Sequence, residues 1–449
     1  MAALTPPMDM TIVKQEIKAM GLPSVGLASI RELNRIVNNI EAASKERFIR
    51  MEMGVPGLEP PKIAVDAEID ALKKGVGSKY PPFDGIPELK QEISAFVKNY
   101  MDKEINPVSC FPTVGSMQGC YMAMMCTTRR IKGKDKLLFI DPGFPVNKNQ
   151  ARVLGAPFEN FDVYEYRGEK LKAKLESYLE KGNIAALMYS NPNNPAWICF
   201  TEQELQTIGE LATKYDCIVM EDLAYFGMDF RQDYSTPGQA PFIPTVARYT
   251  ENYILLISSS KSFSLAGQRI GMTAIPDKLF NSEGNNLKQW FGTDNFGYAY
   301  IFGAMYALSS GVSHSNQYGL LGLLKAVNKG EYNFVEAVRE YGDRASAMKK
   351  YFTDNGFHIV YDKDEDKEIA DGFYFTIAYE GFTGEELVEE LLYYGISAIS
   401  LITTGSDRHE GLRACVSLTG KDRYPDLEQR LSQFAADHPL GSDFKIINS

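Results

Sequence analysis

The sequence predicts an α/β protein, with a large domain built on a mostly parallel, doubly wound sheet and a smaller α+β domain. Continuous apolar runs such as 183–190 and 253–257 alternate with helical segments, a pattern typical of parallel strands covered on both faces. One helical segment begins with Thr201 and Glu204 at the spacing of a capping box. From about residue 330, short strand-like segments mix with helical ones, which favours an α+β arrangement.

The chain of 449 residues is too long for a single hydrophobic core. We expect a large domain over 61–325 and a small C-terminal domain over 326–449. The N-terminal segment 1–60 has no clear strand pattern, and we expect it to pack with the small domain.

Composition excludes several classes of function. The net charge is −11 and no run of Lys or Arg stands out, which argues against a nucleic acid or an anionic membrane as partner. Six cysteines without a C-x-x-C pair and only four histidines argue against a disulfide framework and against a catalytic metal. The N-terminus lacks a secretory pattern, and no apolar stretch reaches the length of a membrane span. We therefore expect a cytoplasmic enzyme.

Each apolar run ends in a polar segment rich in Gly, Pro, Ser or Asn. Ligands of open parallel sheets bind outside the carboxyl ends of the strands. We therefore expect the segments that follow these strands to meet at one site: DPGFP (141–145), NPNNP (191–195), EDLAY (221–225) and SSSK (258–261).

Lys261 follows the apolar run 253–257 directly and lies among small residues. A partly desolvated lysine amine is a nucleophile toward carbonyl groups. The guanidinium of Arg269 suits a phosphate, and Ser258 and Ser260 add hydroxyl donors on one face of the strand end. An amine beside a phosphate cradle is what pyridoxal 5′-phosphate (PLP) requires, although most lysines are simply surface residues.

The segment 258–271 resembles the S-x-S-K-x-F-x-x-x-G-x-R-x-G signature of fold-type I, class I/II aminotransferases. Seven fixed positions match, and further motifs of that family follow in the family's order across most of the chain. The resemblance implies the type I PLP-dependent transferase fold and PLP bound covalently to Lys261.

The resemblance also assigns the partners of the cofactor ring. Asp222 pairs with the pyridine nitrogen, and Tyr225 and Asn194 hold the phenolic oxygen. Without the resemblance, Asp222 reads as a helix cap or a solvated loop acid, Tyr225 as a core aromatic and 190–195 as a turn. The family usually has Thr-Gly after this turn, where this chain has Ala196 and Trp197.

The segment 111–125 reads as a turn that opens a helix, and a helix N-terminus binds phosphate. By resemblance, Gly115 and the backbone of Ser116 and Met117 form the phosphate turn. Phe144 occupies the position of the aromatic that stacks on the pyridine ring, although a buried loop aromatic is the simpler interpretation.

Three more positions follow from the resemblance. Tyr80, in KYPPFDG, corresponds to the tyrosine that reaches the phosphate of the neighbouring subunit, which implies a homodimer with shared active sites. Gly54 would lie near the substrate carboxylate. Arg413, flanked by apolar residues, would bind that carboxylate through its two-pronged guanidinium, unless an internal salt bridge occupies it.

These assignments predict a transaminase that moves an amino group between an L-amino acid and a 2-oxo acid by a ping-pong mechanism. Met117 replaces a lysine of some dicarboxylate-specific relatives, and 288–302 contains aromatics but no arginine, which slightly favours a neutral or aromatic substrate. A PLP-dependent β-lyase, decarboxylase or synthase is the alternative, and a non-catalytic PLP-binding regulator is a weaker one. A dinucleotide oxidoreductase is disfavoured because no G-x-G-x-x-G follows the first strand.

Overall fold

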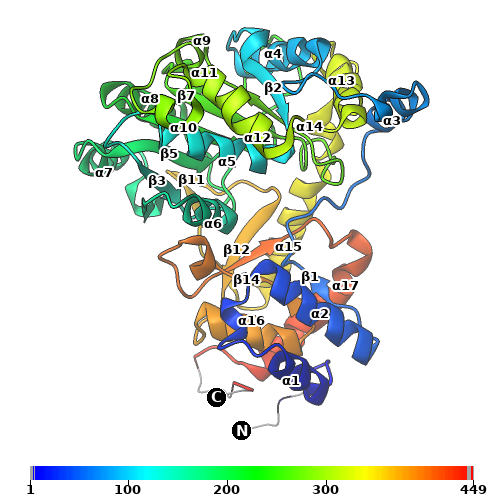
Figure 1. The fold of residues 1–449 in the computed structure, drawn as a ribbon. Coiled ribbons are helices and arrows are strands. Elements are labelled where there is room, and N and C mark those ends of the chain that lie inside the picture. The colour runs from blue at the N-terminus through cyan, green and yellow to red at the C-terminus, as the bar shows by residue number, and fades with distance from the viewer. Residues whose placement is uncertain (1–3, 5, 442–445, 448–449) are drawn as a thin grey trace. The chain divides into compact units, whose positions relative to one another are not determined.

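The computed structural model describes residues 4, 6–441 and 446–447, and its chain divides into two compact units. Unit 1 comprises residues 1–57, 194–198 and 340–449; unit 2 comprises residues 58–193 and 199–339 (Figure 1). The short segment 194–198 thus belongs to unit 1 although the chain on either side of it belongs to unit 2.

Unit 2 contains a seven-stranded sheet in the order β2-β8-β7-β6-β5-β3-β4. Strand β8 is antiparallel to both of its neighbours, and all other adjacent pairs are parallel. The predicted α/β fold with a mostly parallel sheet is therefore confirmed. The strands are β2 Cys110–Thr113, β3 Lys136–Asp141, β4 Phe158–Asp162, β5 Ile184–Ser190, β6 Ile218–Leu223, β7 Tyr253–Ser258 and β8 Gly271–Ala274.

The apolar runs become the central strands because both faces of the sheet are covered. Every residue of β5, β6 and β7 is buried, and since side chains alternate between faces, neither face is left to solvent. The apolar side chains of β6 at Ile218 and Met220 pack in one core with α5 residues such as Met122. Asp222 continues the same alternation and lies on that face of the strand.

Helices surround this sheet (Figure 1). Thr201 and Glu204 form the predicted capping box at the start of α8. The helices of unit 2 are α3 Lys62–Lys73, α4 Pro87–Met101, α5 Gly115–Thr127, α6 Pro145–Leu154, α7 Lys170–Leu179, α8 Glu202–Lys214, α9 Asp277–Phe280, α10 Leu287–Phe291, α11 Phe296–Tyr298, the π-helix η6 Ala299–Met305, α12 Tyr306–Ser309, α13 His314–Asn328 and α14 Phe334–Ala337.

Unit 1 contains a four-stranded antiparallel sheet in the order β14-β15-β12-β9. Its strands are β9 His358–Ile359, β12 Tyr374–Ala378, β14 Ile399–Ser400 and β15 Leu412–Cys415. Its helices are α1 Met10–Ala19, α2 Ile30–Ser44, α15 Glu340–Asp354, α16 Gly384–Tyr393 and α17 Tyr424–Asp437.

The N-terminal segment contains one strand that the sequence pattern did not predict. Strand β1 (Ile49–Arg50) pairs in parallel with β13 (Ile396–Ser397). Two residues are too few to produce a period-two pattern, so this strand depends on its distant partner. The short strands β10 (Lys363–Asp364) and β11 (Lys367–Glu368) form a separate hairpin.

Among the described residues, no helix combines the length and the hydropathy needed to cross a bilayer.

Candidate functional site

Lys261 lies just beyond the carboxyl end of β7, the strand that ends at Ser258. The Ser258 hydroxyl accepts a hydrogen bond from the Ser260 backbone N–H at 3.2 Å, which fixes the turn leading to the lysine. The Lys261 ammonium lies 5.8 Å from the centre of the Tyr225 ring. The structure therefore brings together Lys261 and Tyr225, which are separated in the sequence by strand β7.

Asp222 is buried near the carboxyl end of β6, next to β7 in the sheet. Burial raises the pKa of Asp222 to about 6, and the nearby Lys261 ammonium opposes that rise. The Oδ1 atom is buried without a hydrogen-bond partner among the described residues. A buried acceptor of this kind is costly unless a ligand satisfies it.

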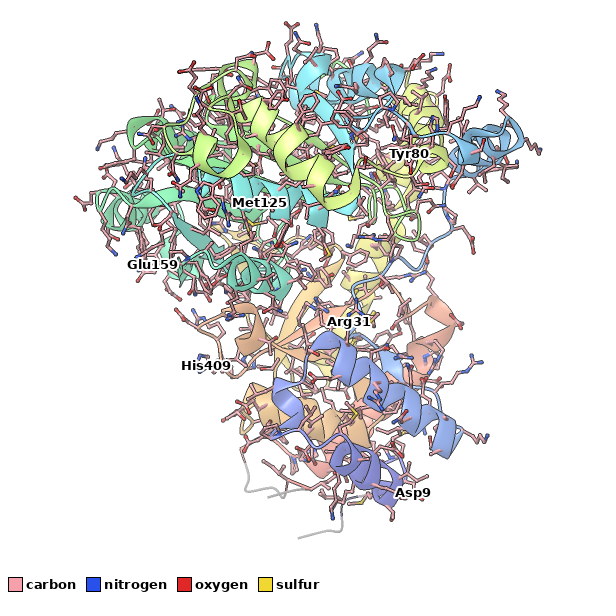
Figure 2. The ribbon with its side chains drawn as sticks, viewed as in Figure 1. Asp9, Arg31, Tyr80, Met125, Glu159 and His409 are labelled. Atoms are coloured by element: carbon pink, nitrogen blue, oxygen red, sulfur yellow. The ribbon has the colours of Figure 1, made fainter. Side chains whose placement is uncertain are left out.

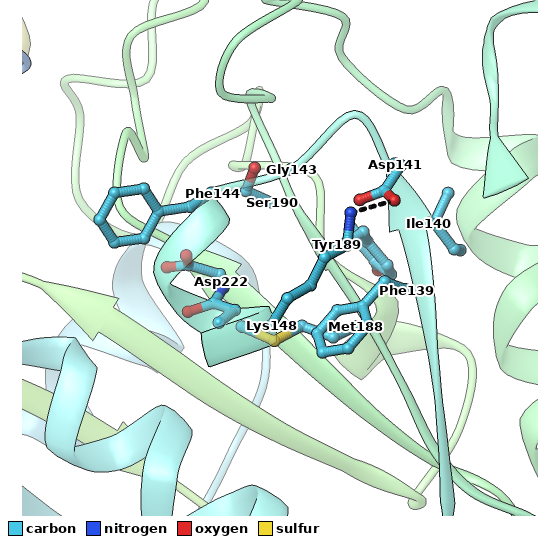
Figure 3. Close-up of a pocket in the computed structure, with 11 residues that line it drawn as sticks. Phe139, Ile140, Asp141, Gly143, Phe144, Lys148, Met188, Tyr189, Ser190 and Asp222 are labelled. Carbon is cyan, nitrogen blue, oxygen red and sulfur yellow. Dashed lines mark hydrogen bonds and ion pairs between the residues drawn. The ribbon is translucent and has the colours of Figure 1, made fainter. Parts of the chain in front are cut away.

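Asp222 and Phe144 line the same pocket (Figure 3). Phe144 immediately precedes α6, and Ser190 at the end of β5 also faces this pocket. At its far side Lys148 points to Asp141, with which it forms an ion pair (Figure 3). The carboxyl ends of β3, β5 and β6 thus meet where the parallel topology predicted a ligand site.

A second part of the site lies at the start of α5. A Cβ on Gly115 would lie 2.6 Å from Arg269 Nη2, so the guanidinium packs directly on this residue. Gly115 also has a φ of +64°, which favours glycine. A Cβ on Gly271 would lie 2.8 Å from the backbone nitrogen of Ser116. Helix N–H groups and a guanidinium converge here, and both bind phosphate.

The remaining predicted residues of unit 2 are exposed. Met117, in the first turn of α5, is partly exposed, and its carbonyl accepts a hydrogen bond from Gln150. Tyr80 is 94% exposed in the loop that precedes α4, and Figure 2 shows it at the surface.

Gly54, Asn194 and Arg413 lie together in unit 1. Arg413 is 1% exposed; its Nη2 donates to the Glu52 carbonyl at 2.6 Å, and its Nη1 donates to Asn194 Oδ1 at 3.4 Å. The guanidinium lies 4.6 Å from the centre of the Tyr374 ring. A Cβ on Gly54 would lie 2.0 Å from the Tyr374 hydroxyl, so Tyr374 also packs against Gly54.

No carboxylate pairs with Arg413 among the described residues, and its buried Nε has no hydrogen-bond partner there. The sequence left open an internal salt bridge of Arg413, and the described residues do not form one. A buried guanidinium is expensive unless it is paired, so an anion from outside the chain would stabilise this group.

The family model for aminotransferase class I and II matches residues 46–360. The chain belongs to this family. The aminotransferase is 24% identical over 322 residues to a probable aspartate aminotransferase of Methanocaldococcus jannaschii, covering 67% of this chain and 81% of the relative. It is 28% identical over 262 residues to aromatic-amino-acid aminotransferase 2 of Thermococcus litoralis, covering 57% and 62% of the two chains.

Solved structures show the fold of the aminotransferase independently. The aspartate aminotransferase of Thermus thermophilus with maleate has a TM-score of 0.71 and 17% identity, covering 97% of this chain and all of that one. The aspartate aminotransferase of Thermotoga maritima has a TM-score of 0.73 and 17% identity, covering 94% and 99%. These structures confirm the predicted type I fold. The family match and the named relatives confirm the predicted PLP-dependent transaminase.

The aminotransferase uses PLP, and it acts on an amino acid and a 2-oxo acid. The geometry fits the cofactor at two points. The unsatisfied Oδ1 of Asp222 can accept a hydrogen bond from a protonated ring nitrogen. Because Gly115 has no Cβ, no side chain of this residue fills the space beside Arg269 Nη2, and a bound phosphate needs that space next to the guanidinium.

Two features of this region were not predicted. Glu221, on the opposite face of β6 from Asp222, accepts hydrogen bonds from the Tyr189 hydroxyl at 3.1 Å and from the Val246 N–H at 3.3 Å. Burial raises the pKa of Glu221 to about 7. The other feature is the buried ion pair of Asp141 and Lys148. In the sequence, Glu221 is marked only by its position next to Asp222, and Lys148 only by its position seven residues after Asp141. Neither position is specific enough to predict these contacts.

Proposed function

We propose that the aminotransferase binds the α-carboxylate of a neutral or aromatic L-amino acid at Arg413. The observation that carries this proposal is the buried guanidinium of Arg413, which has an unsatisfied Nε and no carboxylate partner among the described residues. Two guanidinium nitrogens can bind both oxygens of a carboxylate. Asn194 holds Nη1 and the Glu52 carbonyl holds Nη2, so the fork is oriented before the substrate arrives.

Lys261, Asp222 and Tyr225 are proposed as the catalytic residues. Bound PLP supplies an electron sink that stabilises negative charge at the substrate Cα. Asp222 holds the proton on the ring nitrogen, because an ionised acceptor favours the charged form of its donor. Lys261 Nζ would accept the proton from the substrate Cα as a general base. Tyr225 orients the phenolic oxygen through its hydroxyl.

The remaining proposed contacts hold the cofactor in place. Gly115, the N–H groups of Ser116 and Met117, and Arg269 hold the phosphate, with the hydroxyls of Ser258 and Ser260 nearby. Phe144 packs against the ring, and Asn194 contacts the phenolic oxygen. Gly54 leaves room beside the substrate carboxylate.

Aromatic surroundings support the neutral or aromatic preference. Trp197 lies 6.2 Å from Tyr374, centre to centre, and Tyr374 stacks on the Arg413 guanidinium. Neither ring carries the positive charge that would pair with a second substrate carboxylate, and both favour apolar side chains.

A homodimer with shared active sites is proposed from an exposed aromatic face. This face consists of the exposed Tyr298, Phe302 and Tyr306 on α11, η6 and α12. It also includes the partly buried Phe83, in the loop that carries Tyr80. Phe83 contacts Phe302 at 4.9 Å and Tyr306 at 5.6 Å between ring centres. Large apolar side chains exposed together are typical of subunit interfaces, and a second copy would cover them and bring Tyr80 to a neighbouring phosphate.

We propose a cytoplasmic location because all six cysteines are buried and free. Persistent free thiols are typical of a reducing compartment.

A screen of single amino acids against the holoenzyme tests the substrate proposal. Phenylalanine, tyrosine and leucine should each bleach the absorption band of lysine-bound PLP at lower concentration than aspartate does. Equal or better response to aspartate would overturn the preference.

The variant Arg413→Lys tests the carboxylate contact, because lysine keeps the charge but loses the fork. The KM for the preferred amino acid should rise about 10- to 100-fold, as expected from losing a charge-assisted hydrogen bond. Arg344→Lys is the matched control, since Arg344 is a buried arginine of the same unit that pairs with Glu340. An unchanged KM in Arg413→Lys would contradict the assignment.

A β-lyase is the second candidate, because one relative, at 24% identity over 216 residues, is the S-alkyl-thiohydroximate lyase of Arabidopsis thaliana. A transaminase converts bound PLP to its amine form when it is given an amino acid alone. A lyase leaves the cofactor as the aldehyde and releases ammonia together with the eliminated group. The cofactor form after one turnover distinguishes the two reactions.

A further inference from the structure

Unit 1 contains a cavity of about 140 Å³ that plays no part in the proposed chemistry. It lies between the residues after α2, strand β1 and the turn that precedes α17. The residues that line it are Glu41, Arg47, Phe48, Ile49, Arg50, Leu418, Thr419 and Arg423.

Three arginines and one acid line this cavity, and the acid is already engaged. Glu41 Oε1 accepts a hydrogen bond from the Phe48 N–H at 2.8 Å, and Glu41 Oε2 lies 3.4 Å from Arg50 Nη1. Arg50 also pairs with Glu52 at 3.0 Å. The lining therefore has an excess of positive charge after its internal pairs are counted.

Arg47 supplies most of that excess. Its side chain is exposed, and among the described residues it forms no ion pair. Its carbonyl accepts hydrogen bonds from Arg423 Nη2 at 3.3 Å and Arg430 Nη2 at 2.7 Å, so two more guanidinium groups gather at the same backbone. Burial, and then the nearby Arg423, lower the pKa of Arg430. The acids outside the lining are Glu52, which pairs with Arg50, Asp426, which pairs with Arg423 at 2.9 Å, and Glu46.

Thr419 gives an independent indication of a ligand. It is 1% exposed and lines the cavity, and its Oγ1 has no hydrogen-bond partner among the described residues. A buried hydroxyl without a partner is costly. An oxygen-rich anion in the cavity would remove that cost and would also pair with Arg47 and Arg423.

We propose that this cavity is a binding site for a small phosphate-bearing anion, separate from the PLP phosphate cradle. Guanidinium forks match phosphate oxygens with two hydrogen bonds each, and a hydroxyl can donate to a third oxygen. Arg47, Arg423 and Thr419 are the binding residues, and Arg50 adds charge while Glu41 and Glu52 hold it in place.

Inorganic phosphate is the probe, titrated into the PLP-loaded holoenzyme by calorimetry at constant ionic strength. Loading with PLP occupies the other phosphate cradle. We expect saturable binding and a midpoint of thermal unfolding that rises with phosphate, as ligand linkage requires. Arg47→Gln should weaken phosphate binding about ten-fold, and Thr419→Val should weaken it measurably without removing charge.

Arg31→Gln is the matched control, since Arg31 is an exposed arginine on α2 (Figure 2). Arg31 does not line the cavity. It should bind phosphate as the wild type does. The exposed side chain of Arg47 makes no internal bond that folding requires, so Arg47→Gln should fold normally. The Arg47 variant therefore tests the proposal even if Thr419→Val is unstable. Absence of saturable binding in the wild type, or equal affinity in wild type and Arg47→Gln, would overturn the proposal.

Discussion

Asp222 is a buried carboxylate whose protonation depends on what lies beside it. Burial raises its pKa to about 6, while Lys261 opposes the rise. Ionised Asp222 accepts a hydrogen bond from a protonated ring nitrogen, whereas protonated Asp222 does not favour that charge. Asp222 is fully ionised only at a pH above its raised pKa. The affinity for PLP should therefore depend on the ionisation of Asp222.

The affinity of the cofactor-free protein for PLP should therefore fall as the pH drops through about 6. Asp222→Asn should bind PLP more weakly and lose this component of the pH dependence. Fluorescence titration of PLP at several pH values measures both effects. An identical pH profile in wild type and Asp222→Asn would contradict the assigned role.

Single residues differ in how well the sequence reveals them. Lys261 and Arg269 lie in one dense motif, so the motif alone indicated their chemistry. Glu221 and Lys148 carry no such pattern, because their partners Tyr189 and Asp141 are set by strand pairing and by the turn of α6. Contacts that depend on tertiary geometry leave little trace in local sequence.

The N-terminus of α5 is the element on which the phosphate cradle depends. Gly115 combines a positive φ with a close approach to Arg269, so a side chain there meets two separate obstacles. Gly155 offers a matched comparison, because its φ is +67° but nothing lies within 4 Å of its missing Cβ.

Gly115→Ala should lose both stability and PLP affinity, whereas Gly155→Ala should lose only stability. The backbone penalty of a non-glycine residue at positive φ is about 1 kcal/mol and applies to both variants. Urea unfolding together with PLP titration separates the two effects. Equal PLP affinity in the two variants would show that the close contact with Arg269 is unimportant.

At the scale of elements, the long apolar strands of the seven-stranded sheet could be predicted and the short strands of that sheet could not. The runs that form β5, β6 and β7 are buried throughout and have no competing periodicity. Strand β8 has only four residues, including Gly271 and Thr273, and so lacks a long apolar run. Strand β4 contains charged and polar residues that interrupt its apolar pattern. Their place in the sheet is decided by pairing with neighbours rather than by local pattern.

At the scale of the whole molecule, the division into units could only partly be predicted from sequence. Composition does not distinguish 194–198 from the residues around it, yet Asn194 contacts Arg413 across more than two hundred positions of the chain. Long-range contacts of this kind are a property of topology.

The exposed aromatic face leads to a prediction about assembly. The double variant Tyr298→Asp, Tyr306→Asp should shift the protein from dimer to monomer in sedimentation experiments, because buried charge at an interface core is unfavourable. PLP affinity should fall with it, since Tyr80 would no longer reach a neighbouring cradle. Val153→Asp, at an exposed apolar position on α6, is the control and should remain dimeric. A dimeric double variant with full PLP affinity would contradict the proposal.

The most direct measurement is to identify the lysine that carries PLP. Borohydride reduction of the holoenzyme fixes the cofactor on its lysine, and peptide mass spectrometry then locates it. The cofactor should be found on the peptide that contains Lys261. Lys148 is the critical alternative, because it lines the pocket that contains Asp222. Labelling at Lys148, or at any lysine other than Lys261, would contradict the proposed active site.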